Sequence, residues 1–160
     1  MTDLRIVTTV CTGNLCRSPL AEALLRKHLD LLGVTDVIVQ SAGTGARAGQ
    51  RAIGASRTAA EALGADLGSH STSVMDRATL DESEYVLCAA TEHLDEIFRR
   101  WPDADRNKVR LIGEVLDDPD LVDIDDPYGF DQAMFHLIAR VIDGAMAAWA
   151  EKLVRNPWKD

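Results

Sequence analysis

The stretch Leu4-Arg-Ile-Val-Thr-Thr-Val10, followed by Cys11-Thr-Gly-Asn-Leu-Cys-Arg17 and Ser18-Pro19, decides the fold of this chain. Its first part is rich in β-branched residues and predicts a buried strand. Serine is a good N-cap and proline fits the first helical position, so Ser18-Pro19 predicts a helix start. The leucines between residues 20 and 32 continue this helix to a stop at Gly33. The chain therefore opens with a strand, a loop and a helix.

The same alternation continues along the rest of the chain. Further strands are predicted at residues 36–40, 84–88 and 109–112. Helices are predicted at 53–63, through 94–98 with an end before Pro102, and through 134–153, and an irregular acidic segment at 116–126. This order favours a parallel sheet with right-handed crossovers. We expect an α/β fold with one domain over residues 1–160: a three-layer sandwich with a four-stranded parallel sheet, flavodoxin-like and doubly wound. Such folds bind ligands beyond the carboxyl ends of the strands, where Cys11 lies.

The composition limits the classes of partner. The chain has 160 residues and a formal net charge of -9, which disfavours nucleic acids and anionic membranes because both bind clustered positive charge. Three cysteines are too few for a secreted disulfide framework, and no signal-like or membrane-spanning apolar run occurs. We therefore expect a protein of the reducing cytoplasm. No zinc-like Cys/His spacing, Walker lysine or G-x-G-x-x-G run occurs, so we expect neither a metal nor a cofactor.

The loop after the first strand carries the chemistry. Five residues separate Cys11 from Arg17, enough for the backbone amides to curl around one point beside a helix N-terminus. Gly13 and Asn14 tolerate the positive φ of a tight curl, and Arg17 offers a planar donor fork for two phosphate oxygens. The same surroundings favour Cys11 as a thiolate that attacks phosphorus. The plain alternative, a buried cysteine at a strand end, fits the flanking loop and helix start less well.

Residues 11–19 match, position by position, the signature of a known family, and the chain thereby resembles the low-molecular-weight protein tyrosine phosphatases. The resemblance extends to Ser41-Ala-Gly-Thr44 and Asp126-Pro127-Tyr128 and covers essentially the whole chain. It implies a phosphomonoester hydrolase that forms a phosphocysteine on Cys11, clamps phosphate with Arg17 and uses Asp126 as general acid and base. The implied substrate is a phosphotyrosine protein or an aryl phosphate, with inhibition by phosphate or vanadate. Asp125 ranks second as the acid, and a solvated acidic loop is the plain alternative for both carboxyl groups.

The resemblance also implies supporting residues. The phosphate-binding loop comprises Thr12, Gly13, Asn14, Leu15, Cys16 and Ser18, with Tyr128 and Arg47 at the substrate entrance. The polar network that shapes the loop and stabilises the thiolate comprises Asn14, Ser18, Ser41 and His70. Plain structural roles stay open for three of these: hydrogen bonding for His70, packing for Tyr128 and solvated charge for Arg47. In the family, the loop's second cysteine, here Cys16, can form a reversible disulfide with the nucleophile.

Three features subdivide the family or depart from its pattern. Residues 45–53 lack the aromatic residue of eukaryotic-like members, which favours the bacterial subgroup tied to polysaccharide export. Relatives that act on phosphoarginine carry threonine at the position of Leu15, so leucine favours aryl phosphates. Ala90 stands where relatives often have aspartate after the third strand.

Two other functions stay open on the same fold. An arsenate reductase would need a mobile downstream cysteine pair, and only Cys88, in a predicted strand, is available. A non-catalytic phosphate-binding module would keep the loop but would not need Asp126.

Overall fold

The sheet sets the position of the other elements. Within residues 3–154, which the computed structural model describes, four parallel strands pair in the order β2-β1-β3-β4. They are β1 (Arg5–Cys11), β2 (Val37–Gly43), β3 (Tyr85–Cys88) and β4 (Val109–Leu111). The chain adds β2 on one side of β1 and then crosses to the other side, so the carboxyl ends of β1 and β3 flank the switch point where such sheets bind ligands.

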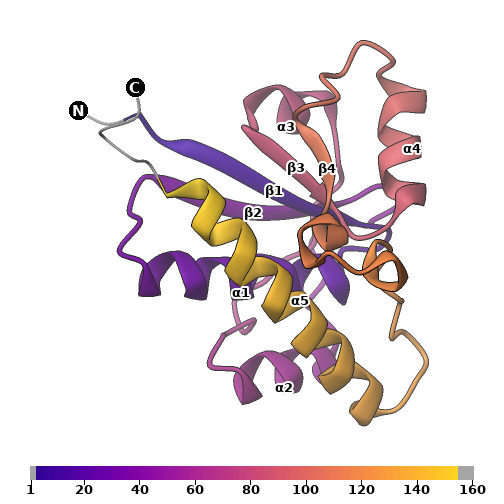
Figure 1. The fold of residues 1–160 in the computed structure, drawn as a ribbon. Helices are drawn as coiled ribbons and strands as arrows, with labels where there is room; N and C mark the ends of the chain where they lie inside the picture. Colours follow the sequence, from indigo (N-terminus) through magenta and orange to yellow (C-terminus); the bar gives the residue numbers. More distant parts are fainter. Residues whose placement is uncertain (1–2, 155–160) are drawn as a thin grey trace.

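Helices cover both faces of this sheet (Figure 1). They are α1 (Arg17–Leu31), α2 (Gly54–Ala62), α3 (Arg77–Glu82), α4 (Thr91–Arg100) and α5 (Gln132–Leu153). Neighbouring strand residues point to opposite faces, so Leu87 packs in one cluster with α1, α2 and α5, and Val86 packs in another with α3 and α4. The expected three-layer α/β architecture is confirmed.

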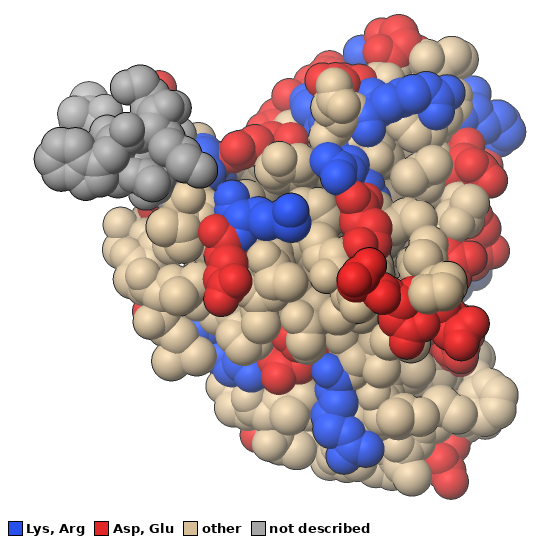
Figure 2. Space-filling model, in the orientation of Figure 1, with Lys and Arg blue, Asp and Glu red and all other residues tan. Residues whose placement is uncertain are grey.

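The segment between β4 and α5 contains two 3-10 helices, η1 (Ile112–Leu116) and η2 (Pro119–Leu121). The prediction that the fourth strand includes Ile112 is wrong, because this buried residue begins η1. A Cβ on Gly113 would overlap the carbonyl oxygen of Leu121, so the absence of a side chain at Gly113 lets η1 and η2 pack together. Acidic side chains gather over this part of the surface (Figure 2).

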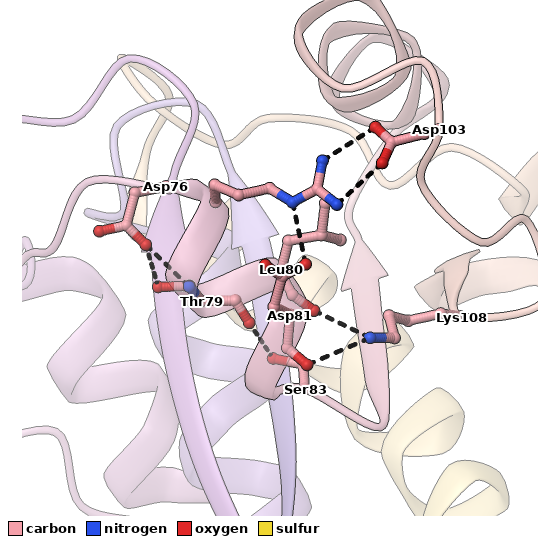
Figure 3. A network of polar contacts seen from close by, with 8 residues as sticks. Asp76, Thr79, Leu80, Asp81, Ser83, Asp103 and Lys108 are labelled. Atoms are coloured by element: carbon pink, nitrogen blue, oxygen red, sulfur yellow. Dashed lines mark hydrogen bonds and ion pairs between the residues drawn. The ribbon is translucent and has the colours of Figure 1, made fainter.

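The sequence pattern does not predict α3. Only Leu80 is buried among its six residues, so the helix lacks an apolar stripe. Its stability comes from polar contacts instead: Asp76 Oδ1 accepts the N–H of Thr79 at 2.8 Å, and Lys108 donates to the carbonyl of Leu80 at 3.1 Å (Figure 3). These contacts fasten α3 beside the start of β4.

By length and composition, α5 is the single helix within residues 3–154 that is apolar enough to cross a membrane. Most of its large apolar side chains, among them Ile142, Met146 and Trp149, are buried in the core against α1 and the sheet. The indole N–H of Trp149 donates to the carbonyl of Ile112 at 3.0 Å, which ties α5 to η1. The apolar character of α5 is therefore that of a core helix.

Candidate active site

Residues 11–17 connect β1 to α1 at the carboxyl end of the sheet. A cavity of about 210 Å³ opens here, lined by Cys11, Thr12, Gly13, Leu15, Cys16, Arg17, Asp126 and Tyr128. The structure thus brings the predicted thiol, guanidinium and carboxylate to one cavity, although Asp126 is more than a hundred residues from the loop in sequence.

Ser18 serves the thiol rather than the helix start. The prediction that Ser18 caps the helix is wrong, because α1 begins at Arg17 with Cys16 in the N-cap position and no side-chain cap. The hydroxyl of Ser18 accepts from Asn14 Nδ2 at 2.8 Å and lies 2.9 Å from Cys11 Sγ. The hydroxyl also lies 3.4 Å from the carbonyl oxygen of Ala42, so its hydrogen can be donated to the sulfur or to this carbonyl.

Asn14 holds the curl of the loop. It is buried and has a φ of 58°, in the left-handed region that asparagine tolerates better than most residues. Its side chain also donates to Ser41 Oγ at 2.9 Å, and its Oδ1 accepts the N–H of Ser73 at 2.9 Å. Its carbonyl accepts from His70 Nε2 at 2.9 Å. Ser41 and His70 therefore lie where the sequence places them, around the loop, and Ser73 is an additional partner that sequence reasoning missed.

Gly43, the last residue of β2, lets the loop approach the sheet. The N–H groups of Thr44 and Gly45 donate to the carbonyls of Cys11 and Thr12, at 3.0 and 2.9 Å. A Cβ on Gly43 would lie 3.0 Å from the Asn14 nitrogen and closer still to the Thr12 oxygen. The loop therefore rests directly on the backbone of residues 43–45.

Arg17 joins the loop to the segment that carries Asp126. The Arg17 side chain is buried, and its Nη1 donates to the carbonyl of Ile124 at 2.9 Å. Its Nη2 lies 3.6 Å from Asp126 Oδ2, and the side chain of Asp126 is 52% exposed. Asp126 Oδ1 accepts the N–H of Tyr128 at 3.1 Å. The guanidinium is thus positioned beside the cavity.

The remaining predicted residues are placed less centrally. Tyr128 is 64% exposed at the rim of the cavity, where a substrate can reach it. Arg47 and Asp125 are exposed, and neither is among the residues that line the cavity. Cys16 is buried beneath the loop, and burial, with the Asp126 carboxylate second, raises the pKa of its thiol to about 12.

His93 is a further residue that sequence reasoning missed. Its Nδ1 accepts the N–H of Ala90 at 3.1 Å, so in the neutral ring the proton is on Nε2, which donates to Thr12 Oγ1 at 2.9 Å. Burial, followed by the Arg17 cation, lowers the pKa of His93 to about 4 and keeps the ring neutral. The sequence signal that could have found His93 is its place three residues after Ala90, whose own side chain cannot cap the helix that follows.

Comparisons with known proteins agree with this geometry. A family model described as low molecular weight phosphotyrosine protein phosphatase matches residues 6–158. A putative low molecular weight protein-tyrosine-phosphatase of Klebsiella pneumoniae is 33% identical, over 92% of this chain and 96% of the relative. A protein-arginine-phosphatase of Geobacillus stearothermophilus is 32% identical, over 90% of this chain and 93% of the relative.

A solved structure is similar as well. The tyrosine phosphatase Wzb from Escherichia coli K30, in complex with sulphate, has a TM-score of 0.83 and 32% identity and covers 94% of this chain and 99% of its own. The relatives named here are bacterial, as expected, and the expectation of a phosphatase is confirmed. The chain belongs to the low molecular weight phosphotyrosine protein phosphatase family.

Proposed function

We propose that this phosphatase acts on phosphotyrosine in proteins through a phosphocysteine intermediate, with Cys11 as nucleophile, Arg17 as phosphate clamp and Asp126 as general acid and base. The observation that carries the proposal is that these three side chains line one cavity. The related Wzb structure is in complex with sulphate, an anion of the same shape as phosphate.

In the first step the Cys11 thiolate attacks phosphorus, and the bond from phosphorus to the phenolic oxygen breaks. The loop amides and the Arg17 guanidinium stabilise the charge on the equatorial oxygens of the transition state. Protonated Asp126 transfers its proton to the leaving oxygen, so that the tyrosine departs as a neutral phenol. The hydroxyl of Ser18, 2.9 Å from the sulfur, can donate a hydrogen bond to the thiolate before attack.

In the second step Asp126, now a carboxylate, takes a proton from a water molecule that attacks the phosphocysteine. The sulfur–phosphorus bond breaks, inorganic phosphate leaves, and the Cys11 thiolate is restored. Phosphate and vanadate are expected to inhibit because each occupies the loop as the reacting group does.

The preference for an aryl phosphate rests on Leu15 and Tyr128. Leu15 lines the cavity and Tyr128 its rim, so an aliphatic and an aromatic side chain flank the position of the leaving group. Such a setting favours a flat aromatic ring. Phosphoarginine is the competing substrate to include in any assay, because a protein-arginine-phosphatase is among the relatives.

Three free cysteines support a reducing compartment, the cytoplasm.

The position of Cys88 argues against an arsenate reductase. Cys88 is fully buried in β3 and packs in the cluster with α3 and α4, whereas Cys11 packs in the cluster on the opposite face. A resolving cysteine must reach the nucleophile, and Cys88 is on the wrong side of the sheet for that. A non-catalytic module has no use for the pairing of Asp126 with Arg17.

The test is turnover of a phosphotyrosine peptide, a phosphoarginine peptide and a small aryl phosphate by wild type, Cys11→Ser and Asp126→Asn. We expect Cys11→Ser to be inactive yet to bind phosphate, and Asp126→Asn to lose about 10²–10⁴-fold in turnover, the usual scale for an acid–base group. Asp125→Asn is the matched control and should keep turnover near wild type. Turnover by Cys11→Ser would refute the nucleophile, and faster turnover of phosphoarginine would refute the substrate.

A further inference from the structure

Helix α4 begins without a capping side chain at its N-cap position. Its N-cap residue is Ala90, which has no hydrogen-bonding atom beyond the backbone. The first N–H groups of a helix have no partner within the helix and need one from outside. His93, within the helix, accepts the N–H of Ala90 at 3.1 Å, but the N–H of Thr91 needs a partner from another part of the chain.

Asp123 supplies the main one. Its Oδ1 accepts both the N–H and the hydroxyl of Thr91, the first residue of α4, at 2.8 Å each. A carboxylate at this end of a helix is also favoured by the helix dipole. Asp123 is 32 residues away from Thr91 in sequence, so this cap joins two separate segments.

The next residue in the chain continues this attachment with contacts of its own. Ile124 is buried, its N–H donates to the carbonyl of Ala89 at 2.8 Å, and its carbonyl accepts from Arg17 at 2.9 Å. Asp126 follows two residues later, and its own contacts are few: the 3.6 Å approach to Arg17 and the N–H of Tyr128. The position of its carboxylate is thus determined largely by how firmly residues 123 and 124 are held.

We propose that Asp123 is a positioning residue for Asp126: by capping α4 from outside, it holds the acid segment over the phosphate loop. This inference rests on the proposed role of Asp126 as general acid. When the cap is lost, residues 123–126 lose their fixed attachment to α4, while the loop around Cys11 keeps its own network of Asn14, Ser18 and Ser41. The defect should therefore appear in proton transfer and not in the nucleophile.

Substrates with different leaving groups distinguish a defect in proton transfer from a defect in the nucleophile. A nitrophenolate leaves without much help from an acid, whereas an unsubstituted phenoxide, like that of tyrosine with a pKa of about 10, needs a proton. The measured quantity is kcat/KM, which reports the steps up to phenol release, for p-nitrophenyl phosphate and for phenyl phosphate. The rate of Cys11 alkylation by iodoacetamide reports the phosphate loop separately.

We compare Asp123→Ala, Asp123→Asn and Asp120→Ala. Asp123→Ala should lose about tenfold on phenyl phosphate, the scale of a lost helix cap, and less than about twofold on p-nitrophenyl phosphate, with alkylation of Cys11 unchanged. Asparagine is as good a cap as aspartate, so Asp123→Asn should stay near wild type although it removes the same charge. Asp120→Ala is the matched control, because the carboxylate of Asp120 makes no hydrogen bond or ion pair within residues 3–154.

Equal losses on both substrates, or none, in Asp123→Ala would overturn the inference. Equal losses in Asp123→Asn and Asp123→Ala would overturn it as well, because charge and not the cap would then be responsible. Asp126→Asn is run in parallel: a flat response to the leaving group in that variant refutes the acid role of Asp126 itself, whatever Asp123 does. A thermal melt of each variant confirms that the compared proteins are folded.

Discussion

Gly43→Ala is the substitution that most directly tests whether the phosphate loop depends on its contact with β2. The added methyl would lie 2.8 Å from the Cβ of Ala46 and 3.0 Å from the backbone nitrogen of Asn14, and it would overlap the carbonyl oxygen of Thr12. The surroundings cannot move cheaply, since the Gly43 N–H and carbonyl are bonded to Ser73 and Met75 on the far side at 2.9 Å each.

The size of the effect follows from these distances. Non-bonded carbon atoms prefer a separation of about 3.5–4.0 Å, so relief of the contact with Ala46 and Thr12 needs a displacement of about 1 Å. With β2 held by its neighbours, the loop from Thr12 to Asn14 must take most of this shift. A misplacement of about 1 Å at a reacting group costs about 10²-fold in rate. We therefore expect kcat/KM to fall by about two orders of magnitude.

The assay is hydrolysis of p-nitrophenyl phosphate, supported by vanadate affinity and by the rate of Cys11 alkylation, both of which should fall with activity. Gly45→Ala is the control, because its Cβ would make an ordinary contact of 3.6 Å with the Thr12 side chain. That variant should keep wild-type kinetics. If Gly43→Ala hydrolyses the substrate as fast as Gly45→Ala, the loop does not need the close approach and the reasoning fails.

Gly113→Ala should displace the segment that leads to Asp126, because the added Cβ would overlap the carbonyl oxygen of Leu121. We expect kcat on phenyl phosphate to fall about 10²-fold, and an unchanged kcat would contradict this expectation. The pKa of His93 is about 4 in the folded protein and about 6.5 in the unfolded chain. Between these pH values only the unfolded chain takes up the proton, so the free energy of unfolding decreases as the pH falls from about 6.5 to about 4. Denaturant titrations over that pH interval should show that the free energy of unfolding falls by about 3 kcal/mol more in wild type than in His93→Asn. Equal decreases in the two proteins would contradict a buried, neutral His93. Because burial raises the pKa of the Cys16 thiol to about 12, iodoacetamide should label Cys11 well before Cys16 in peptide mass spectra, and equal labelling would count against the structure.

The sequence predicts the parts of the fold that depend on local pattern. The β-branched run before Cys11 and the leucine spacing after Pro19 are enough for β1, the loop and α1, and the alternation of elements is enough for the parallel sheet. The sequence does not predict α3, because a six-residue helix with Leu80 as its only buried side chain shows no periodic spacing of apolar residues. The cap at Asp76 was the available signal.

The candidate site divides in the same way. Cys11 and Arg17 belong to one continuous motif and are predictable, whereas the contacts of His93 with Thr12 and of Asp123 with Thr91 span 81 and 32 residues. Such contacts become visible only when the order of the strands is known, because they join the ends of neighbouring strands. Ser18 is predicted in part: a serine before proline is typical of a helix cap, which the structure does not contain, whereas the place beside the sulfur that the resemblance implies agrees with the 2.9 Å distance.

The conformation of Asn14 has a consequence for the order in which the protein is made. The groups that hold it belong to Ser41, His70 and Ser73, which follow it by 27, 56 and 59 residues. During translation the loop leaves the ribosome long before these partners, so the nascent N-terminal segment carries the complete signature without the shape that makes it reactive. The thiol gains its activating environment only after almost half of the chain has emerged and folded back on it. We therefore expect reactivity only after the chain as far as Ser73 has folded, and an N-terminal fragment that ends before Ser41 should behave as an ordinary thiol peptide.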